Sequence, residues 1–178
     1  MKPIVHVPHE ELIKSADRVG RIDKRVGKII AEMRETLIHA DNPKGVGLAA
    51  PQIGIPLRIF LLRPQEKDPI SAFINPEYVG KSRELVKGIE GNKLEGCLSI
   101  PHVWGRVKRH KQVTIRFTDE TGASHEEEFA GFPAIIVQHE IDHLEGILFT
   151  RRCIEQKSTL YKPGVDEDGK EILEPIEI

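Results

Sequence analysis

The stretch QHEIDHLEG, residues 138–146, holds two histidines four positions apart with a glutamate after the first. Residues four apart in an α-helix lie on the same face, so His139 and His143 can both reach one metal ion. Glu140 lies about 100° further round the helix, where it can border the ion without binding it. That position suits a general base acting on water at a catalytic metal. The stretch therefore predicts a metal site on a helix.

Apolar residues flank this motif and predict that its helix is mostly buried: Ile135, Ile136, Ile141 and Leu144. Pro133 suits the first turn of the helix, and Gly146 can end it. The alternative is an exposed helix that carries the motif by chance, because only three of its five positions are fixed. Buried flanks argue against this alternative, since buried His and Glu side chains need partners.

Two imidazoles are too few for a catalytic site, which usually has three protein ligands and one open position. No histidine follows His143, so a third ligand downstream would be a carboxylate: Glu145, Glu155, Glu167 or Glu171. Upstream, LEGCLSIP (94–101) offers Cys97, whose thiolate is a strong ligand for a borderline-soft divalent ion. Cys97 is also a suitable small core residue, so the residues alone leave the third ligand open.

The segment GVGLAAPQ (45–52) contains two glycines that allow other groups to approach its backbone closely. We exclude a dinucleotide-binding turn because no strand clearly precedes it and Pro51 and Gln52 follow it. Gln52 offers an amide donor that can stabilise an oxyanion, although taken by itself it is better interpreted as a solvent-facing turn residue. Prolines and glycines break the periodicity from residue 41 to 56, which predicts a long loop.

Hydrophobic periodicity elsewhere predicts an α+β protein. Apolar residues recur at helical spacing over residues 22–39, after Asp23 as a candidate cap. QVTIRFT (112–118) alternates cleanly and predicts a hairpin with HEEEFA (125–130). Further strands are predicted over 57–62, 72–79 and 83–91. Strands with one helix before them and one after favour α+β over a βαβ repeat.

Composition narrows the class of protein. The 178 residues suit a single domain. The net charge of -2 is not typical of a nucleic-acid-binding protein, which normally has a basic surface. No apolar run approaches the ~18 residues of a membrane span, and the N-terminus lacks a signal-peptide apolar region. We therefore expect a cytoplasmic protein without nucleic-acid or membrane partners. Two cysteines cannot form a disulfide framework, and Cys153 is expected to pack in the core.

The last residues differ in composition from the rest. Residues 163–178 contain six acidic side chains, one lysine, two prolines and two glycines. This composition predicts an acidic C-terminal tail that is extended or poorly ordered. A single catalytic domain is accordingly expected over residues 1–162.

The three segments GVGLAAPQ, EGCLS and QHEIDHLEG, in this order, resemble the signature motifs of the peptide deformylase family. IVHVPHEELIKSADRV and FINPE also resemble that family, and the similarity runs from about residue 3 to residue 150. The resemblance implies antiparallel β-sheets around a central metal-binding helix, with the amphipathic helix near the N-terminus. It implies that Cys97, His139 and His143 bind one divalent ion, expected to be Fe2+ with Zn2+ or Ni2+ as substitutes.

The implied activity is removal of the formyl group from the N-terminal formylmethionine of newly made polypeptides. By resemblance, Glu140 transfers the proton, while the Gln52 side chain and the Leu98 backbone N–H stabilise the oxyanion. Gly47 holds the substrate backbone. Four residues match positions that line the methionine slot, although each also suits ordinary core packing: Val46, Phe132, Ile135 and Ile136.

Trp104 falls in the segment after EGCLS, where members of the family vary, whereas Glu95 and Arg109 match family positions. Trp104 is expected either at the substrate entrance or as a partly buried surface residue, and Glu95 and Arg109 in supporting roles. Some deformylases dock on the ribosome through a basic C-terminal helix. The tail here is acidic, so a transient ribosome association would lack that helix.

Two alternative functions are also compatible with the sequence. A metalloprotease would use His139, His143 and a downstream carboxylate such as Glu155, and would keep its metal after Cys97→Ser. A non-catalytic relative would hold a structural metal, but it would have no use for Glu140 or Gln52.

Overall fold

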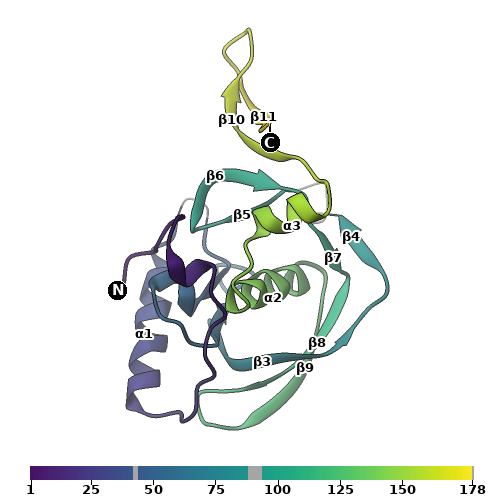
Figure 1. Ribbon diagram of the computed structural model, residues 1–178. Helices are drawn as coiled ribbons and strands as arrows, with labels where there is room; N and C mark the ends of the chain where they lie inside the picture. Colours follow the sequence, from purple (N-terminus) through teal and green to yellow (C-terminus); the bar gives the residue numbers. More distant parts are fainter. Residues whose placement is uncertain (42–43, 88–93, 178) are drawn as a thin grey trace.

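A computed structural model describes residues 1–41, 44–87 and 94–177 (Figure 1). The described chain is an α+β fold with antiparallel sheets. The largest sheet has the order β1 (Gly47–Ala49), β2 (Ile59–Leu62), β3 (Ser71–Lys81), β8 (Gln112–Thr118) and β9 (Ser124–Ala130). A second sheet has the order β11 (Glu171–Pro175), β10 (Leu160–Val165), β6 (Ile100–Gly105) and β5 (Glu95–Cys97). β4 (Leu85–Lys87) pairs with β7 (Lys108–His110).

Helix α2 (Gly131–Leu144) carries the His-Glu-His motif. Every residue from Ala134 to Leu144 is buried, because the helix packs against β1, β2, β8 and β9 and also against β7. A helix that is apolar on most of its surface belongs inside a protein. Gly146 follows its C-cap with a φ of 69°, and a Cβ there would meet the backbone of Ile13 and Lys14 at 2.7 Å. The predicted helix and its glycine stop are both present.

Helix α1 (Lys24–Ile38) corresponds to the helix predicted over residues 22–39. The Asp23 carboxylate accepts hydrogen bonds from the backbone N–H groups of Arg25 and Val26, as expected for a cap. The helix buries Val26, Ile29, Ile30, Met33, Thr36 and Leu37. The apolar side chains among them pack in the same cluster as Leu48, Ile59 and Leu61, which brings α1 against β1 and β2.

Several predicted strands are also present. β8 and β9 form the predicted hairpin, in a register that pairs Val113 with Phe129 and Thr118 with Ser124. The strands predicted over 57–62 and 72–79 correspond to β2 and β3. Only Leu85–Lys87 of the strand predicted over 83–91 is a strand, and residues 88–91 lie outside the described part of the chain.

The prediction of a long loop over residues 41–56 was wrong in part. Residues 47–49 form β1, paired with β2, and Ala50–Ile53 form the 3-10 helix η2. A strand of three residues is too short to show periodicity, and pairing with β2 decides its conformation. The consequence is that Gly47 and Gln52 lie on defined elements.

The C-terminal segment, expected to be extended or poorly ordered, is extended in the structure. Residues 160–165 and 171–175 form the β10–β11 hairpin, which projects from the rest of the molecule in Figure 1. The Asp166 carboxylate caps the turn by accepting from the N–H groups of Asp168 and Lys170. β10 also pairs with β6 through Leu160 and Tyr161. Cross-strand pairing therefore gives this acidic segment a defined extended conformation.

Helix α3 (Phe149–Glu155), which the periodicity analysis missed, covers β5 and β6. Its Cys153 is fully buried in a cluster with Phe149 and Leu160, and the prediction that Cys153 packs in the core is confirmed. Among the described residues, no helix is both long and apolar enough to cross a membrane.

Candidate metal centre

Three side chains from two elements meet inside the molecule. Cys97 ends β5, and His139 and His143 lie one turn apart on α2. Their ligand atoms all lie within 4.8 Å of one another, and Cys97 Sγ is 3.2 Å from His143 Nε2. Metal–sulfur and metal–nitrogen bonds of about 2.3 and 2.0 Å would separate two tetrahedral ligands by roughly 3.5 Å. The donor set therefore fits one small divalent cation.

The orientation of His139 is set by a carboxylate behind it. Its Nδ1 lies 2.7 Å from Oε1 of the buried Glu95. A proton on Nδ1 satisfies this contact and leaves the lone pair of Nε2 for a cation, a common arrangement behind metal-binding histidines.

The electrostatics also favour a cation among these residues. Burial disfavours charge on His139, but its contacts with Cys97 and Glu95 outweigh burial and raise its pKa well above the usual value. The same surroundings favour a metal cation, which displaces that proton on binding. Burial lowers the pKa of His143 well below its usual value, so this imidazole is neutral, as a metal ligand must be.

Glu95 also belongs to a buried ion network that holds β5, β7 and α2 together. Arg109 on β7 donates to Glu95 at 2.6 and 3.1 Å and to Asp142 on α2 at 2.6 Å. Arg152 on α3 completes the network by donating to Asp142 at 2.7 Å. Burial opposes ionisation of Glu95, but the charge of Arg109 and the hydrogen bond from His139 hold its pKa at about 2. These contacts agree with the supporting roles expected for Glu95 and Arg109.

Gln52 lies at the end of η2 and is buried, which excludes the solvent-facing alternative. Its Oε1 accepts from the Ala49 N–H at 2.8 Å, which fixes the amide. Its Nε2 then faces Ser99 Oγ at 3.3 Å and Cys97 Sγ at 3.6 Å. The amide donor is thereby aimed at the donor cluster.

Ser99 is a site residue that the sequence analysis missed. Its side chain is fully buried, its backbone N–H donates to Cys97 Sγ at 3.4 Å, and its hydroxyl meets Gln52. The available signal was its position two residues after Cys97 in EGCLS. Asp142 was missed for a similar reason, because its position inside HEIDH does not show which arginines it meets.

Glu140 is the carboxylate beside the cluster. It is buried, and its Oε2 has no hydrogen-bond partner among the described residues. Burial raises its pKa to about 7. Gly47 on β1 packs directly on the carboxylate, since a Cβ at Gly47 would clash with Glu140 Oε1 and approach Ile136 Cγ2 at 2.8 Å. A carboxylate with this pKa can accept and return a proton near neutral pH.

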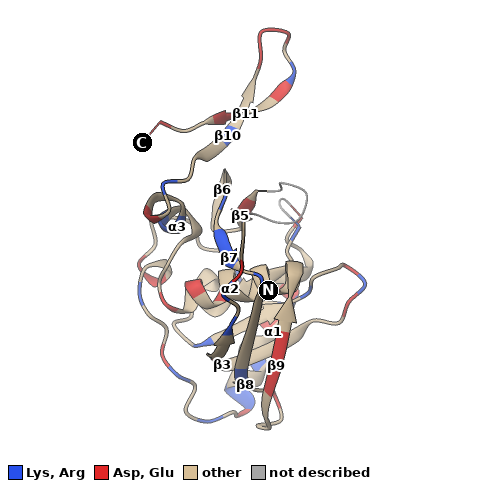
Figure 2. Ribbon diagram, turned by 90° about the vertical axis from the view of Figure 1, so that its right-hand side faces the viewer, with Lys and Arg blue, Asp and Glu red and all other residues tan. Residues whose placement is uncertain are grey.

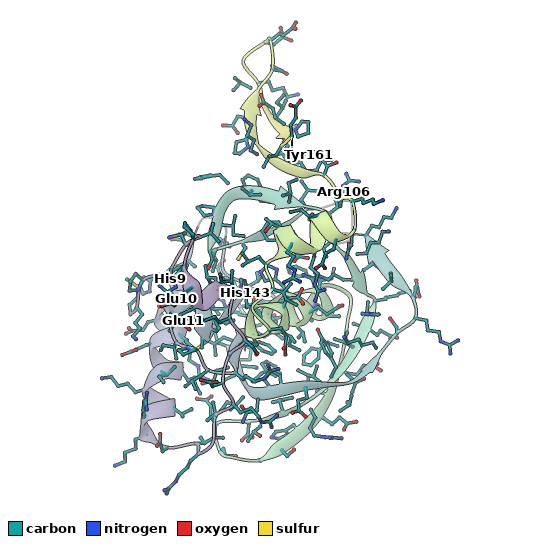
Figure 3. The ribbon with its side chains drawn as sticks, viewed as in Figure 1. His9, Glu10, Glu11, Arg106, His143 and Tyr161 are labelled. Carbon is teal, nitrogen blue, oxygen red and sulfur yellow. The ribbon has the colours of Figure 1, made fainter. Side chains whose placement is uncertain are left out.

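A pocket of about 220 Å³ opens beside the cluster. All the remaining candidate site residues line it together with Cys97, His139 and Glu140: Val46, Gly47, Gln52, Leu98, Phe132, Ile135 and Ile136. Trp104, which is half-buried, also borders the pocket, in agreement with a place at its entrance. Figure 3 labels His143, which lies on α2 near the C-terminal end of the helix.

The alternative third ligand does not reach the cluster. Glu155 lies on α3, where it pairs with Arg151 at 2.9 Å and Arg152 at 3.4 Å. Among the described residues, the only group placed to hold a metal is Cys97 with the two histidines. The α+β fold, the buried donor set and the adjacent carboxylate define a metal-dependent hydrolase.

Comparison with known proteins narrows this class. The family model described as polypeptide deformylase matches residues 1–159. A peptide deformylase of Pseudothermotoga lettingae is 44% identical over 138 residues, covering 78% of this chain and 74% of that protein. The crystal structure of the Thermotoga maritima peptide deformylase has a TM-score of 0.78 at 36% identity, covering 85% of this chain and 97% of that one.

A third match is a structure of the class I type b peptide deformylase from Acinetobacter baumannii with Met-Ala-Ser bound. Its TM-score is 0.76 at 32% identity, and it covers 85% of this chain and 98% of that chain. The chain belongs to the polypeptide deformylase family. It is a hydrolase that removes the formyl group from the N-terminus of newly made polypeptides.

Proposed function

We propose that this chain deformylates N-formylmethionyl polypeptides at the site formed by α2, β1, β5 and η2. Cys97, His139 and His143 would hold one divalent ion, Fe2+ in the cell, with Zn2+ or Ni2+ able to substitute. When bound, the ion supplies a Lewis acid that makes water easier to deprotonate near neutral pH. The observation that carries the proposal is the buried Cys-His-His donor set with Glu140 beside it.

Glu140 would transfer the proton. Its carboxylate takes a proton from the attacking water as the water oxygen bonds to the formyl carbon. It then gives the proton to the departing amine as the C–N bond breaks, which yields formate and a free N-terminus. The raised pKa of about 7 and the unpartnered Oε2 support both steps.

Gln52 and Leu98 would stabilise the oxyanion that forms on the formyl oxygen. Gln52 Nε2 is preorganised because its Oε1 is held by the Ala49 N–H. Leu98 follows Cys97 directly, so its backbone N–H lies next to the cluster. Donors that are fixed before the reaction stabilise developing charge without reorganising.

The substrate would be held by its backbone and by its methionine side chain. Gly47 offers backbone groups on the wall of the pocket, where a larger residue would collide with Glu140. An apolar slot for the methionine is lined by Val46, Phe132, Ile135 and Ile136. An unbranched thioether adapts readily to such a slot.

The proposal extends to the domain organisation, the location and the partners of the protein. α2 would be the central metal-binding helix of a catalytic domain over residues 1–162, with α1 as its N-terminal amphipathic helix and 163–178 as an acidic extension. The protein would act in the cytoplasm. A transient association with the ribosome would occur without a basic C-terminal helix.

The test is formate release from formyl-Met-Ala-Ser by protein purified without oxygen and loaded with Fe2+ or Ni2+. Wild type should release formate rapidly, and Glu140→Gln should be slower by about 10²–10⁴-fold because it removes the proton carrier. Metal content should be equal in the two proteins. Absence of release from fully metallated wild type would refute the proposal.

Cys97→Ser separates the proposed donor set from the protease alternative. The variant should bind metal weakly and lose formate release, because a hydroxyl is a poorer ligand than a thiolate. Full metal content in this variant would contradict Cys97 as a ligand.

A further inference from the structure

Trp104 borders two hollows in the surface. One is the pocket beside the donor cluster, and the other is a groove of about 690 Å³ along the second sheet. The groove is lined by His102 and Trp104 from β6, Pro163 and Val165 from β10, and Glu171 and Leu173 from β11. Trp104 is therefore a lining residue of both hollows.

The strand register shows how the pocket and the groove lie along one sheet. Gly96 is opposite Trp104, Trp104 is opposite Tyr161, and Tyr161 is opposite Pro175. Directly opposed residues on neighbouring strands point to the same face of a sheet. One sheet face therefore runs from Gly96, next to Cys97, to the hairpin. Figure 3 labels Tyr161 at the base of that hairpin.

The hairpin end of this face is apolar and exposed. Val165 is 63% exposed and Leu173 47% exposed. Exposed apolar patches bordered by polar residues are typical of binding surfaces. The hairpin also lies beyond residues 1–159, the segment that the family model matches. It is therefore an addition to the part of the chain that holds the donor cluster.

The hairpin also carries negative charge. Asp166, Glu167 and Asp168 occupy its turn, and Glu171 lines the groove. Figure 2 shows these acidic residues on the projecting end of the molecule, with few basic residues beside them. A ligand with basic side chains would complement this charge.

We propose that the groove binds the residues of the polypeptide that follow formylmethionine, in extended conformation, and favours apolar and basic side chains among them. This inference rests on the proposed function, since it places formylmethionine in the pocket. A pocket of about 220 Å³ cannot enclose a longer chain, which must leave past its rim. Each extended residue adds about 3.3 Å, so a peptide of several residues can pass Trp104 and reach the hairpin.

The kinetic test compares three substrates. One is formyl-Met-Ala, and the others are eight-residue peptides that begin in the same way and continue with alternating Leu and Lys or alternating Leu and Glu. The Leu/Lys peptide should have a kcat/KM about tenfold above formyl-Met-Ala, the order of effect expected from burying an apolar side chain. It should also exceed the Leu/Glu peptide, by a margin that shrinks at high salt.

The variant is the double substitution Val165→Ser and Leu173→Ser. This variant should lower the kcat/KM of the Leu/Lys peptide to that of formyl-Met-Ala. The kcat/KM of formyl-Met-Ala itself should stay unchanged. Ile154→Ser, on the exposed side of α3 and 55% exposed, is the matched control and should alter neither rate. The proposal would be overturned if the double variant kept the wild-type ratio of kcat/KM between the Leu/Lys peptide and formyl-Met-Ala. Equal kcat/KM values for the Leu/Lys and Leu/Glu peptides would also overturn it.

Binding can be measured without catalysis, because Trp104 is the only tryptophan. Its fluorescence should change and saturate as the unformylated Leu/Lys peptide is added, and the double variant should bind about tenfold more weakly. If no peptide releases formate, the proposed function fails. This titration still tests whether the groove binds the peptide. Sedimentation showing a dimer that the double variant abolishes, with unchanged peptide binding, would assign the groove to a second copy.

Discussion

The position of the Glu140 carboxylate depends on the absence of a side chain at Gly47 on β1. The carboxylate lies against Gly47, where any side chain would overlap it. The orientation of the Gln52 amide depends on the Ala49 N–H, which donates to its Oε1. The amide Nε2 then faces Cys97 and Ser99. At this scale, the site works through close contacts between the GVGLAAPQ segment and α2.

Gly47→Ala should lower formate release by at least tenfold while the protein stays folded. The added Cβ would clash with Glu140 and approach Ile136 Cγ2 at 2.8 Å, so the carboxylate must move. A small displacement of a catalytic group is costly to the rate. Formate release and circular dichroism measure the two effects.

Gly27→Ala is the matched control for this substitution. Gly27 lies on the exposed side of α1 with open space around its Cα. Alanine there should leave the rate unchanged and stabilise the protein by up to about 1 kcal/mol, because alanine favours helix. Equal activity in the two variants would contradict the close packing of Gly47 on Glu140.

At the scale of elements, the ion network joins parts of the chain that are distant in sequence. Arg109 on β7 contacts Glu95 on β5 and Asp142 on α2, and Arg152 on α3 contacts Asp142 from the other side. Glu95 in turn contacts His139. The network therefore holds β5 and α2, which carry the donor set, in fixed relative positions.

Arg109→Met should lower the free energy of unfolding by about 3–5 kcal/mol, because it leaves two buried carboxylates without their shared cation. Arg109 and Glu95 are each 5% exposed, so water cannot replace the lost contacts. Urea unfolding monitored by circular dichroism gives the value. Metal affinity should fall as well, since Glu95 then holds His139 less firmly.

Arg116→Met provides the comparison. Arg116 pairs with Glu126 at 3.1 Å on the surface, where both side chains are more than half exposed. Exposed pairs contribute about 0–1 kcal/mol, so this variant should unfold near the wild-type midpoint. A cost for Arg109→Met as small as that for Arg116→Met would mean that the network does not stabilise the fold.

At the scale of the whole molecule, a bound ion would connect the two larger structural units. Cys97 belongs to the sheet of β5, β6, β10 and β11, while the histidines lie on α2, which packs on the sheet of β1, β2, β3, β8 and β9. Figure 1 shows α2 between these parts, with the hairpin projecting beyond them.

Removing the metal with a chelator should therefore lower Tm. An ion present at 1,000-fold its Kd stabilises the folded state by about 4 kcal/mol, which corresponds to roughly 8–16 °C for a chain of this length. Calorimetry of the metallated and chelated proteins measures the difference. Cys97→Ala should show little of this shift, and an equal shift in that variant would mean that the ion binds elsewhere.

The local features of this protein could be predicted from its amino-acid sequence. Helical spacing located α1 and α2, alternation located the β8–β9 hairpin, and the His-Glu-His spacing located two of the three members of the donor set. These features depend on neighbours a few residues apart, which periodicity reports directly. The three ordered motifs also indicated the family.

Contacts between residues far apart in the chain depend on the folded structure. Cys97 reaches His143 across 46 positions, and Arg109 reaches Asp142 across 33, so no local pattern signals either contact. The short strand β1 owes its conformation to pairing with β2, against the loop that its composition favoured, and the acidic β10–β11 hairpin is ordered by pairing of β10 with β11 and β6. Strand pairing and buried charge are properties of the assembled fold, because their partners are chosen by packing rather than by sequence spacing.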